Sequence, residues 1–476
     1  MCSVWLKAVT ANAAPDELPI LARSRQGLAR LLTDDLAPLR TLSMALMGDP
    51  AMALRVLQQA NVVPHRHFRA DVVTLEDAAH MLGTQTLLRL ESEAAVDERV
   101  LNAERLASYR RSAGRAVLAA LFAYDWAEID HDRFPSEVSL AALLNNLGEL
   151  FLLAHGDARI SRYLELVEGC HVLPHEAEYV SLGESLEDLG HALAVQWGLP
   201  EMVREAMRAR NARHPRALCV MLATQIARYA FSAWRHPMQL DDLRLAGTIL
   251  ELEQPDLAQR INRVLDDFNH MAIDYGLAPL KHLPIGHDGR PATLVLPRQV
   301  VFCLVPRADD FAAAITALGA GEPIDRESVL ANLLRGLHRG LGLNRVVFAT
   351  YCPREETLTA EYLVGTDFEP SFNRFSLSRA DGGLFAELLD APSAVWLNDD
   401  NQADLASRVP APLLELIGVT RFFVMSLWVR GRAIGLVYAD RRTESCRLDA
   451  RSYQSFRELV GQAAQCLERL AGQAIS

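Results

Sequence analysis

The sequence lacks the features that would assign it at once to a secreted, membrane or metal-ribbon class. Its seven cysteines include no CxxC pair, which argues against a zinc ribbon or a disulfide framework and for reduced thiols. No run of about 20 apolar residues is present, and the opening residues are too short for a signal peptide. We therefore expect a cytoplasmic protein without membrane association.

Positive charge is also outnumbered, with 48 Lys and Arg against 60 Asp and Glu. A formal net charge of -12 at pH 7 opposes general nucleic-acid binding, because a phosphate backbone attracts a positive surface. The GxSxG elbow, the P-loop and GxGxxG are absent, so no familiar nucleophile, nucleotide or dinucleotide motif points to an enzyme. What the chain does have is length: 476 residues, 50% of them hydrophobic, supply material for two or three cores.

Helical periodicity dominates the first half. Asp49 precedes a proline and a helical apolar pattern, which is typical of an N-cap with proline at the first helical position. Thr74 and Asp77 resemble a capping box, and Gly83 is predicted to end the helix that they begin. The stretch Ser139 to Ala154 is apolar on nearly every side, which predicts a central helix of a bundle.

Four separate segments of this half resemble the HDOD family, whose members are catalytically degenerate relatives of the HD phosphohydrolases and act in bacterial signalling. The segments are Leu18–Pro19, Gly48–Asn61, Thr74–Gly83 and Gln196–Pro200. Their order and spacing make the resemblance specific over roughly residues 16–280. The resemblance implies an all-α domain with a remodelled metal site.

The same resemblance shows what has replaced the metal ligands of the parent enzymes. A His-Asp pair would give a metal an imidazole and a bridging carboxylate, whereas two neutral amides bind such a metal poorly. None of the expected ligands is retained, so we expect no metal, no cofactor and no catalysis. The replacements are Arg111 at the first His position, Asn145 and Asn146 at the His-Asp pair, Glu149 at the Lys of HDxGK, Leu186 at a third His, and Arg210 with Asn211 at the His-His pair.

Two interpretations of the arginines in this region remain open. They are solvated helix faces or partners of the plentiful carboxylates. Alternatively, Arg111 and Arg210 help to form a polar or anion site in the relic cleft, because guanidinium groups bind anions through planar bidentate contacts. We expect Arg111 to lie beside Asn145 and Asn146, with Glu149 or another nearby carboxylate as its partner.

In the second half the periodicity changes from that of helices to that of strands. Asp325 and Asp449 are predicted to cap the helices that flank this region. Alternating apolar residues predict two hairpins, each built from two strands. The four strands are Arg345–Tyr351, Leu358–Val364, Arg421–Val429 and Ala433–Asp440.

This order of elements resembles a GAF domain over roughly residues 300–472, most closely in Ile434–Asp440. GAF domains often bind a cyclic nucleotide or another small molecule between the sheet and a crossover segment, and others serve as dimer contacts. The NKxnFx3DE signature of cyclic-nucleotide binding is absent. Phe375, Phe385 and Trp396 are candidates for lining a ligand pocket, although aromatic residues at such positions are more often core.

The predicted organisation has four parts. They are a loose N-terminus (1–15), an all-α HDOD domain (16–275), a linker rich in proline and glycine (276–299), and an α/β GAF-like domain with a central antiparallel sheet (300–476).

The favoured function is that of a non-enzymatic regulatory protein in bacterial signal transduction. The HDOD domain would be a scaffold for a signalling protein partner. The GAF-like domain would sense a small molecule or nucleotide, or form a homodimer through the apolar stripe of its closing helix. Its state would reach the HDOD domain through residues 276–299. The alternative is a residual phosphohydrolase or nucleotide-binding enzyme that uses the former HD cleft.

Overall fold

The computed structural model describes residues 4–11, 13–33, 38–62, 71–155, 158–170, 172–295, 302–319, 325–366, 369–443 and 445–473. Its contacts divide the chain into two compact units. The helical unit comprises Cys2–His171 and Ser181–Gln299, and the sheet unit comprises Val172–Val180 and Val300–Ser476. The chain therefore enters the sheet unit twice, first through the short segment Val172–Val180.

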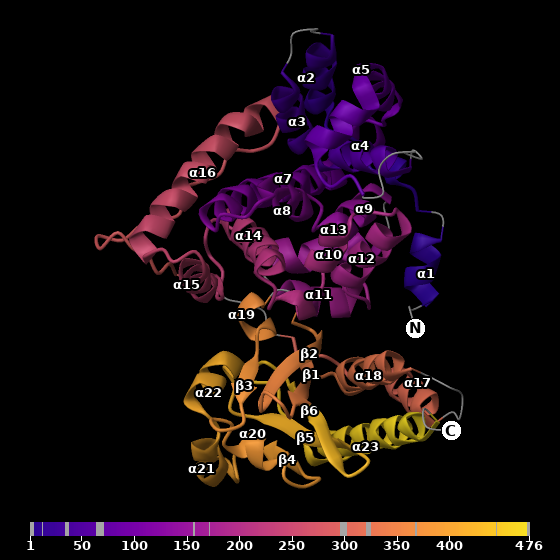
Figure 1. The fold of residues 1–476 in the computed structure, drawn as a ribbon, viewed down its shortest axis with the longest axis vertical. Coiled ribbons are helices and arrows are strands. Elements are labelled where there is room, and N and C mark those ends of the chain that lie inside the picture. Colours follow the sequence, from indigo (N-terminus) through magenta and orange to yellow (C-terminus); the bar gives the residue numbers. More distant parts are fainter. Residues whose placement is uncertain are drawn as a thin grey trace. The chain divides into compact units, whose positions relative to one another are not determined.

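The helical unit is built around α7 (Ala103–Ile129), against which α8, α9, α14 and α16 pack (Figure 1). Just over half of the residues of α7 are buried, including Phe122 and Trp126, because small residues alternate with large ones along it. The other helices of the unit are α1 (Val4–Thr10), α2 (Ala22–Leu32), α3 (Leu39–Met47), α4 (Pro50–Val62), α5 (Leu75–Glu93), α6 (Asp97–Val100), α8 (Pro135–Leu143), α9 (Leu147–His155), α10 (Ala158–Leu164), α12 (Leu186–Gln196), α13 (Glu201–Ala206), α14 (Pro215–Phe231), α15 (Gln239–Ile249) and α16 (Gln254–Tyr275).

Capping residues fix where several of these helices begin. As predicted, Asp49 Oδ1 accepts two backbone N–H groups of the first turn of α4, at 3.0 and 3.2 Å. The Thr74 hydroxyl likewise accepts the N–H of Asp77 (3.1 Å) at the start of α5. Gly83 ends the first helical stretch as predicted, because it adopts the non-helical angles φ 70° and ψ 163°, which glycine tolerates. A second stretch, counted with α5, continues beyond this kink to Glu93.

Two expectations for this unit need correction. Residues 1–15 are not loose throughout, since they contain α1 with Leu6 buried. The apolar stretch predicted as one central helix is two, α8 and α9, with a turn at residues 144–146.

By length and composition, Pro135–His155 is the one helical stretch in the described part of the chain that could cross a membrane. Of its most apolar window, 78% is buried inside the protein, as in the core of a bundle.

The sheet unit contains a six-stranded antiparallel sheet in the order β3-β2-β1-β6-β5-β4. Both predicted hairpins are confirmed, and β3 and β4 extend the sheet at its edges. Asp325 and Asp449 cap α18 and α23 as predicted. The elements are α11 (Pro174–Ser181), α17 (Ala308–Gly319), α18 (Arg326–Arg335), β1 (Arg345–Cys352), β2 (Thr357–Val364), α19 (Pro370–Asn373), β3 (Ser376–Ser378), α20 (Leu384–Glu387), β4 (Ala394–Leu397), α21 (Gln402–Leu405), α22 (Ala411–Ile417), β5 (Phe422–Val429), β6 (Arg432–Asp440) and α23 (Ala450–Gln473).

Each face of the sheet is covered by its own apolar layer. Helices α17, α18 and α23 pack on one face and the short helices α20 and α22 on the other (Figure 1). The apolar stripe of α23, including Phe456, Leu459 and Val460, is buried against the sheet. Its members therefore stabilise the unit itself, which leaves little apolar surface on this helix for a dimer.

Cys303 and Cys446 form a disulfide across a sequence separation of 143 residues. The prediction of reduced thiols is therefore wrong for this pair. The spacing of the cysteines in the sequence did not predict this disulfide, because only the folded chain brings the segment before α17 next to the loop between β6 and α23. Of the other described cysteines, Cys170, Cys219, Cys352 and Cys466 are free.

Candidate functional site

The two asparagines at the former His-Asp position lie in the turn between α8 and α9. Asn146 Nδ2 donates to the backbone oxygen (2.9 Å) and the hydroxyl (2.8 Å) of Ser112 on α7. Asn145 Nδ2 donates to the backbone oxygen of Ala206 on α13 (3.4 Å). Asn146 Oδ1 is buried and has no hydrogen-bond partner in the described part of the chain. Both amides thus tie the turn to neighbouring helices.

Next to this turn, Glu149 forms an ion pair with Arg115, which comes from α7. The side chains are 3% and 12% exposed. Burial alone would lower the pKa of Arg115, but the charges of Glu149, Tyr163 and Glu168 together with the hydrogen bond to Glu149 outweigh burial and raise that pKa. The guanidinium is therefore held as a cation within the unit, and its positive charge compensates the negative charge of the Glu149 carboxylate.

Arg111 lies one turn earlier on α7 and pairs with Glu168 (3.5 Å), with 47% of its own side chain exposed. Its partner is thus another nearby carboxylate rather than Glu149. Burial raises the pKa of Glu168, against the lowering effect of Arg111 and Arg115. No hydrogen bond joins Arg111 to either asparagine among the described residues.

The remaining replaced ligands have local roles. Asn211 Nδ2 donates to the backbone oxygen and the carboxylate of Glu205 (2.9 and 2.8 Å), and Arg210 is half-buried in the same short 3-10 turn. Leu186 opens α12, and a Cβ added to Gly148 on α9 would lie 2.6 Å from its carbonyl oxygen. Gly148 therefore permits α9 and α12 to approach closely.

These contacts leave no evident ligand set for a metal. In the part of the chain that the structure describes, no three His, Cys, Asp or Glu side chains come together in a way that could hold a metal ion. Glu149 and Glu168, the carboxylates of the relic centre, both face guanidinium groups. That no metal binds remains a prediction, and solution measurements must test it.

The sheet unit has a small cavity of about 20 Å³ between its sheet and the covering short helices. Phe375 and Phe385 line it, as predicted for a ligand pocket, together with Val347, Ala349, Phe372, Leu413, Ile417, Leu436 and Tyr438. Trp396 does not. It packs on the opposite face of the sheet against Phe423 and Tyr453, at ring-centroid distances of 5.9 and 5.8 Å, and so belongs to the core under α23.

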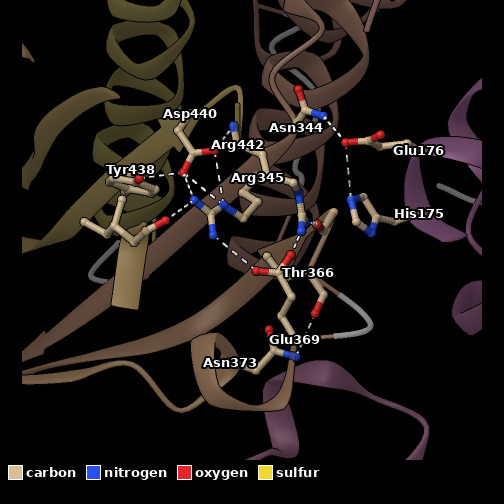
Figure 2. A network of polar contacts seen from close by, with 12 residues as sticks. His175, Glu176, Asn344, Arg345, Thr366, Glu369, Asn373, Tyr438, Asp440 and Arg442 are labelled. Atoms are coloured by element: carbon tan, nitrogen blue, oxygen red, sulfur yellow. Dashed lines mark hydrogen bonds and ion pairs between the residues drawn. The ribbon is translucent and has the colours of Figure 1, made fainter. Parts of the chain in front are cut away.

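A buried network of charges adjoins this cavity through Tyr438 (Figure 2). The Tyr438 hydroxyl donates to Asp440 (2.5 Å), and Arg345 at the start of β1 donates to both oxygens of the same carboxylate (3.1 and 3.0 Å). Arg345 also reaches Glu369 (3.2 Å), which pairs in turn with Arg442. Burial would lower the pKa of Arg345, but the charges of Asp440 and Glu369 raise it.

The segment Val172–Val180 joins the same network. Asn344 Nδ2 donates to Glu176 on α11 (3.1 Å), and the His175 ring lies 4.0 Å from that carboxylate (Figure 2). Burial raises the pKa of Glu176 to about 7, against the lowering effect of Arg442. On the same helix, the Tyr179 hydroxyl donates to the backbone oxygens of Val305 (2.8 Å) and Arg339 (3.1 Å).

Comparison with known families agrees with this arrangement. The HDOD domain family matches residues 18–213 and the GAF domain family matches residues 325–467. The protein joins an HDOD domain to a GAF domain. Both resemblances seen in the sequence, and the predicted fold class, are thereby confirmed. The HDOD match includes residues 172–180, which cluster with the GAF domain in the folded chain.

Solved structures with similar folds include HDOD and GAF proteins. The MmoQ response regulator of Methylococcus capsulatus is 22% identical over 52% of this chain and 98% of that chain, with a TM-score of 0.39. An HDOD domain protein of unknown function from Geobacter sulfurreducens is 17% identical over 57% of this chain and 96% of that one (TM-score 0.32). A GAF domain/HD domain protein from the same organism is 18% identical over 33% and 97% (TM-score 0.26). A search among curated proteins found no match.

Sequence reasoning missed the charge network of the GAF domain. Arg345 and Asp440 were recognised only as the ends of two strands in different hairpins. The pairing of β1 with β6 places them directly opposite one another. An arginine beginning one buried strand and an aspartate ending another is the signal that could have indicated the pair.

Proposed function

We propose that this HDOD/GAF protein is a non-enzymatic regulator in bacterial signal transduction, in which the HDOD domain binds a signalling protein and the GAF domain responds to a small molecule. The observation that carries the proposal is the ion pair of Arg115 with Glu149. A buried cation paired with Glu149, three residues after Asn146, repels a divalent metal, and the charge of the carboxylate that could attract one is already compensated. The HDOD domain is then left with a closed, rigid centre that suits a scaffold.

Metal content and hydrolysis together test the absence of catalysis. The full chain is purified from cells supplied with manganese and iron, and its metal content is measured beside its activity on cyclic and linear phosphodiesters. We expect substoichiometric metal and no hydrolysis above buffer. About one transition ion per chain, with hydrolysis that a chelator abolishes and Glu149→Gln reduces, would instead support the residual phosphohydrolase.

The cavity of the GAF domain favours a small apolar ligand over a nucleotide. Its lining offers one polar group, the Tyr438 hydroxyl, which already donates to Asp440. A volume of about 20 Å³ is close to that of a single bound water, so a ligand of more than a few atoms must displace Phe375 or Phe385. A nucleotide would in addition bring phosphate charges into a site without a free donor.

Calorimetric titration with benzene or indole, and separately with cyclic AMP and cyclic GMP, tests this ligand class. We expect binding of the aromatic probes only, and its loss in Ala349→Leu, which fills the cavity from β1. Trp396→Phe on the opposite face is the matched control and should bind as the wild type does. Stoichiometric binding of a cyclic nucleotide, abolished in Ala349→Leu, would instead identify the cavity as a nucleotide site and contradict the preference for an apolar ligand.

We further propose that α11 conveys the ligand state of the GAF domain to the HDOD domain. Since Tyr438 belongs both to the cavity wall and to the charge network, a ligand that moves its ring disturbs Asp440 and Arg345.

Tyr179→Phe removes two hydrogen bonds that hold α11, so amide exchange in residues 174–181 should accelerate. Tyr124→Phe on α7 is the control. Unchanged exchange in Tyr179→Phe would exclude α11 as the element that responds.

A further inference from the structure

The segment at residues 302–307, here called the strap, has neither helical nor strand structure and is held in the GAF domain by a few specific contacts. Phe302 N–H donates to Glu176. Arg307 donates to the backbone oxygen of Tyr179 (2.6 Å) and lies 4.4 Å from the centroid of its ring. The backbone oxygen of Val305 accepts the Tyr179 hydroxyl. The strap therefore provides much of the surface that α11 contacts.

The disulfide ties the beginning of this strap to the loop between β6 and α23. Cys303 is exposed, whereas Cys446 is 3% exposed. The loop that contains Cys446 also contains Arg442, which pairs with Glu369 and donates to the backbone oxygen of Gly365 (3.1 Å). One covalent bond thus joins the support of α11 to the charge network.

We propose that Cys303 and Cys446 are a reversible thiol oxidation site that controls how firmly α11 is held. The exposed position of Cys303 admits an oxidant or a reductant, and the buried position of Cys446 supplies a resolving thiol at bonding distance, with the two Cα atoms 5.3 Å apart. Neither sulfur is required by the relic centre or by the cavity. The site therefore adds a second input to the GAF domain.

The chemistry needs a peroxide for oxidation and a dithiol for reduction. The Cys303 thiol loses its proton, and the thiolate attacks one oxygen of the peroxide, so that the O–O bond breaks and a sulfenic acid forms. The leaving hydroxide takes up the thiol's proton and departs as one water. The Cys446 thiol then attacks that sulfur, forms the S–S bond and releases a second water. The two thiols lose two electrons in total, and these reduce the peroxide. In the reverse direction, a dithiol of the thioredoxin class exchanges with the disulfide and is itself oxidised to a disulfide.

Reduction should loosen the strap from its Cys303 end, while Arg307 keeps the other end in place through its own backbone N–H bond to Arg339 (3.0 Å). Phe302 then exchanges its bond to Glu176 for water. We expect amide exchange in residues 302–306 and 174–180 to become about tenfold faster in the dithiol form, because local opening follows the loss of the contacts that hold a segment. The strands should respond less, since no hydrogen bond among the described residues joins the strap to a strand.

Mass spectrometry and hydrogen exchange on the full chain test the site. Protein treated with hydrogen peroxide should yield a linked Cys303–Cys446 peptide, and a thioredoxin-type dithiol should release it. The Cys303→Ser/Cys446→Ser variant should show the fast exchange of the reduced form in either condition. Cys352→Ser, which removes a free thiol at the end of β1, is the matched control and should switch as the wild type does.

Three results would overturn the proposal. One is the absence of the linked peptide after oxidation. Another is a disulfide that excess dithiol does not reduce in the folded chain, which would make the bond purely structural. The third is equal exchange at residues 302–306 and 174–180 in oxidised and reduced wild-type protein. This last comparison uses no variant, so it decides the question even if the serine variant folds poorly.

Discussion

Removing Arg115 from its pair with Glu149 is the sharpest test of the relic centre. The two side chains are 12% and 3% exposed, so water cannot replace the lost partner. Breaking a buried pair from one side costs about 3–5 kcal/mol, because an uncompensated charge stays inside the protein. We therefore expect Arg115→Met to lower the free energy of unfolding of the HDOD domain by about 3 kcal/mol or more.

A double replacement distinguishes the net stabilisation by the ion pair from the free-energy cost of leaving one buried charge without a partner. Arg115→Met with Glu149→Leu leaves no charge behind, so most of the lost stability should return, to within about 1 kcal/mol of the wild type. Arg162→Met is the matched control. It breaks the exposed pair with Glu165, whose members are 53% and 61% exposed, and should cost under about 1 kcal/mol.

Urea denaturation followed by far-UV circular dichroism measures these differences, with two transitions fitted because the chain has two domains. The reasoning fails if Arg115→Met costs no more than Arg162→Met. It also fails if the double variant is as unstable as Arg115→Met alone, because packing rather than charge would then account for the loss.

Three further predictions concern positions where close packing or burial dominates. Gly148→Ala should destabilise the HDOD domain by about 2 kcal/mol or more in thermal denaturation, since the new Cβ would meet the carbonyl oxygen of Leu186 at 2.6 Å; Gly27→Ala, with nothing within 4 Å, should not. Burial raises the pKa of Asp49 from 3.8 to about 6. The folded state therefore binds this proton more tightly, and roughly 3 kcal/mol of stability present below pH 4 should be lost as pH rises through about 6, but not in Asp49→Asn. Arg345→Lys should lower the midpoint of the GAF domain transition, because an ammonium cannot donate to both carboxylate oxygens in one plane; an unchanged midpoint would contradict that role.

The sequence predicted the fold wherever local chemistry decides it. The caps at Asp49, Thr74, Asp325 and Asp449 each depend on residues at most three positions away, and the structure confirms them. The strands of both hairpins follow from alternation, which is equally local. Gly83 shows the limit, because the predicted break occurs there but a second helical stretch, which was not predicted, continues after it to Glu93.

The candidate site depends on distant residues and was harder to predict. Nothing near Glu149 in the sequence indicates that its partner comes from α7, 34 positions earlier. The same holds for Cys303 and Cys446, and for the face of the sheet on which Trp396 lies. Each of these contacts is set by tertiary packing, which local periodicity in the sequence does not reveal.

The path of the chain is the reason for proposing α11 rather than residues 276–299 as the route between the two domains. Residues 276–299 cluster with the helical unit and lead into the sheet unit once, whereas α11 clusters with the sheet unit and is preceded and followed by HDOD sequence. A few residues after α11, Leu186 begins α12, and its carbonyl oxygen packs against Gly148 two residues after the asparagine turn. Under this proposal a displacement of α11 is passed along the chain to α12, and from α12 to the asparagine turn beside Gly148, because close-packed helices transmit strain rather than absorb it.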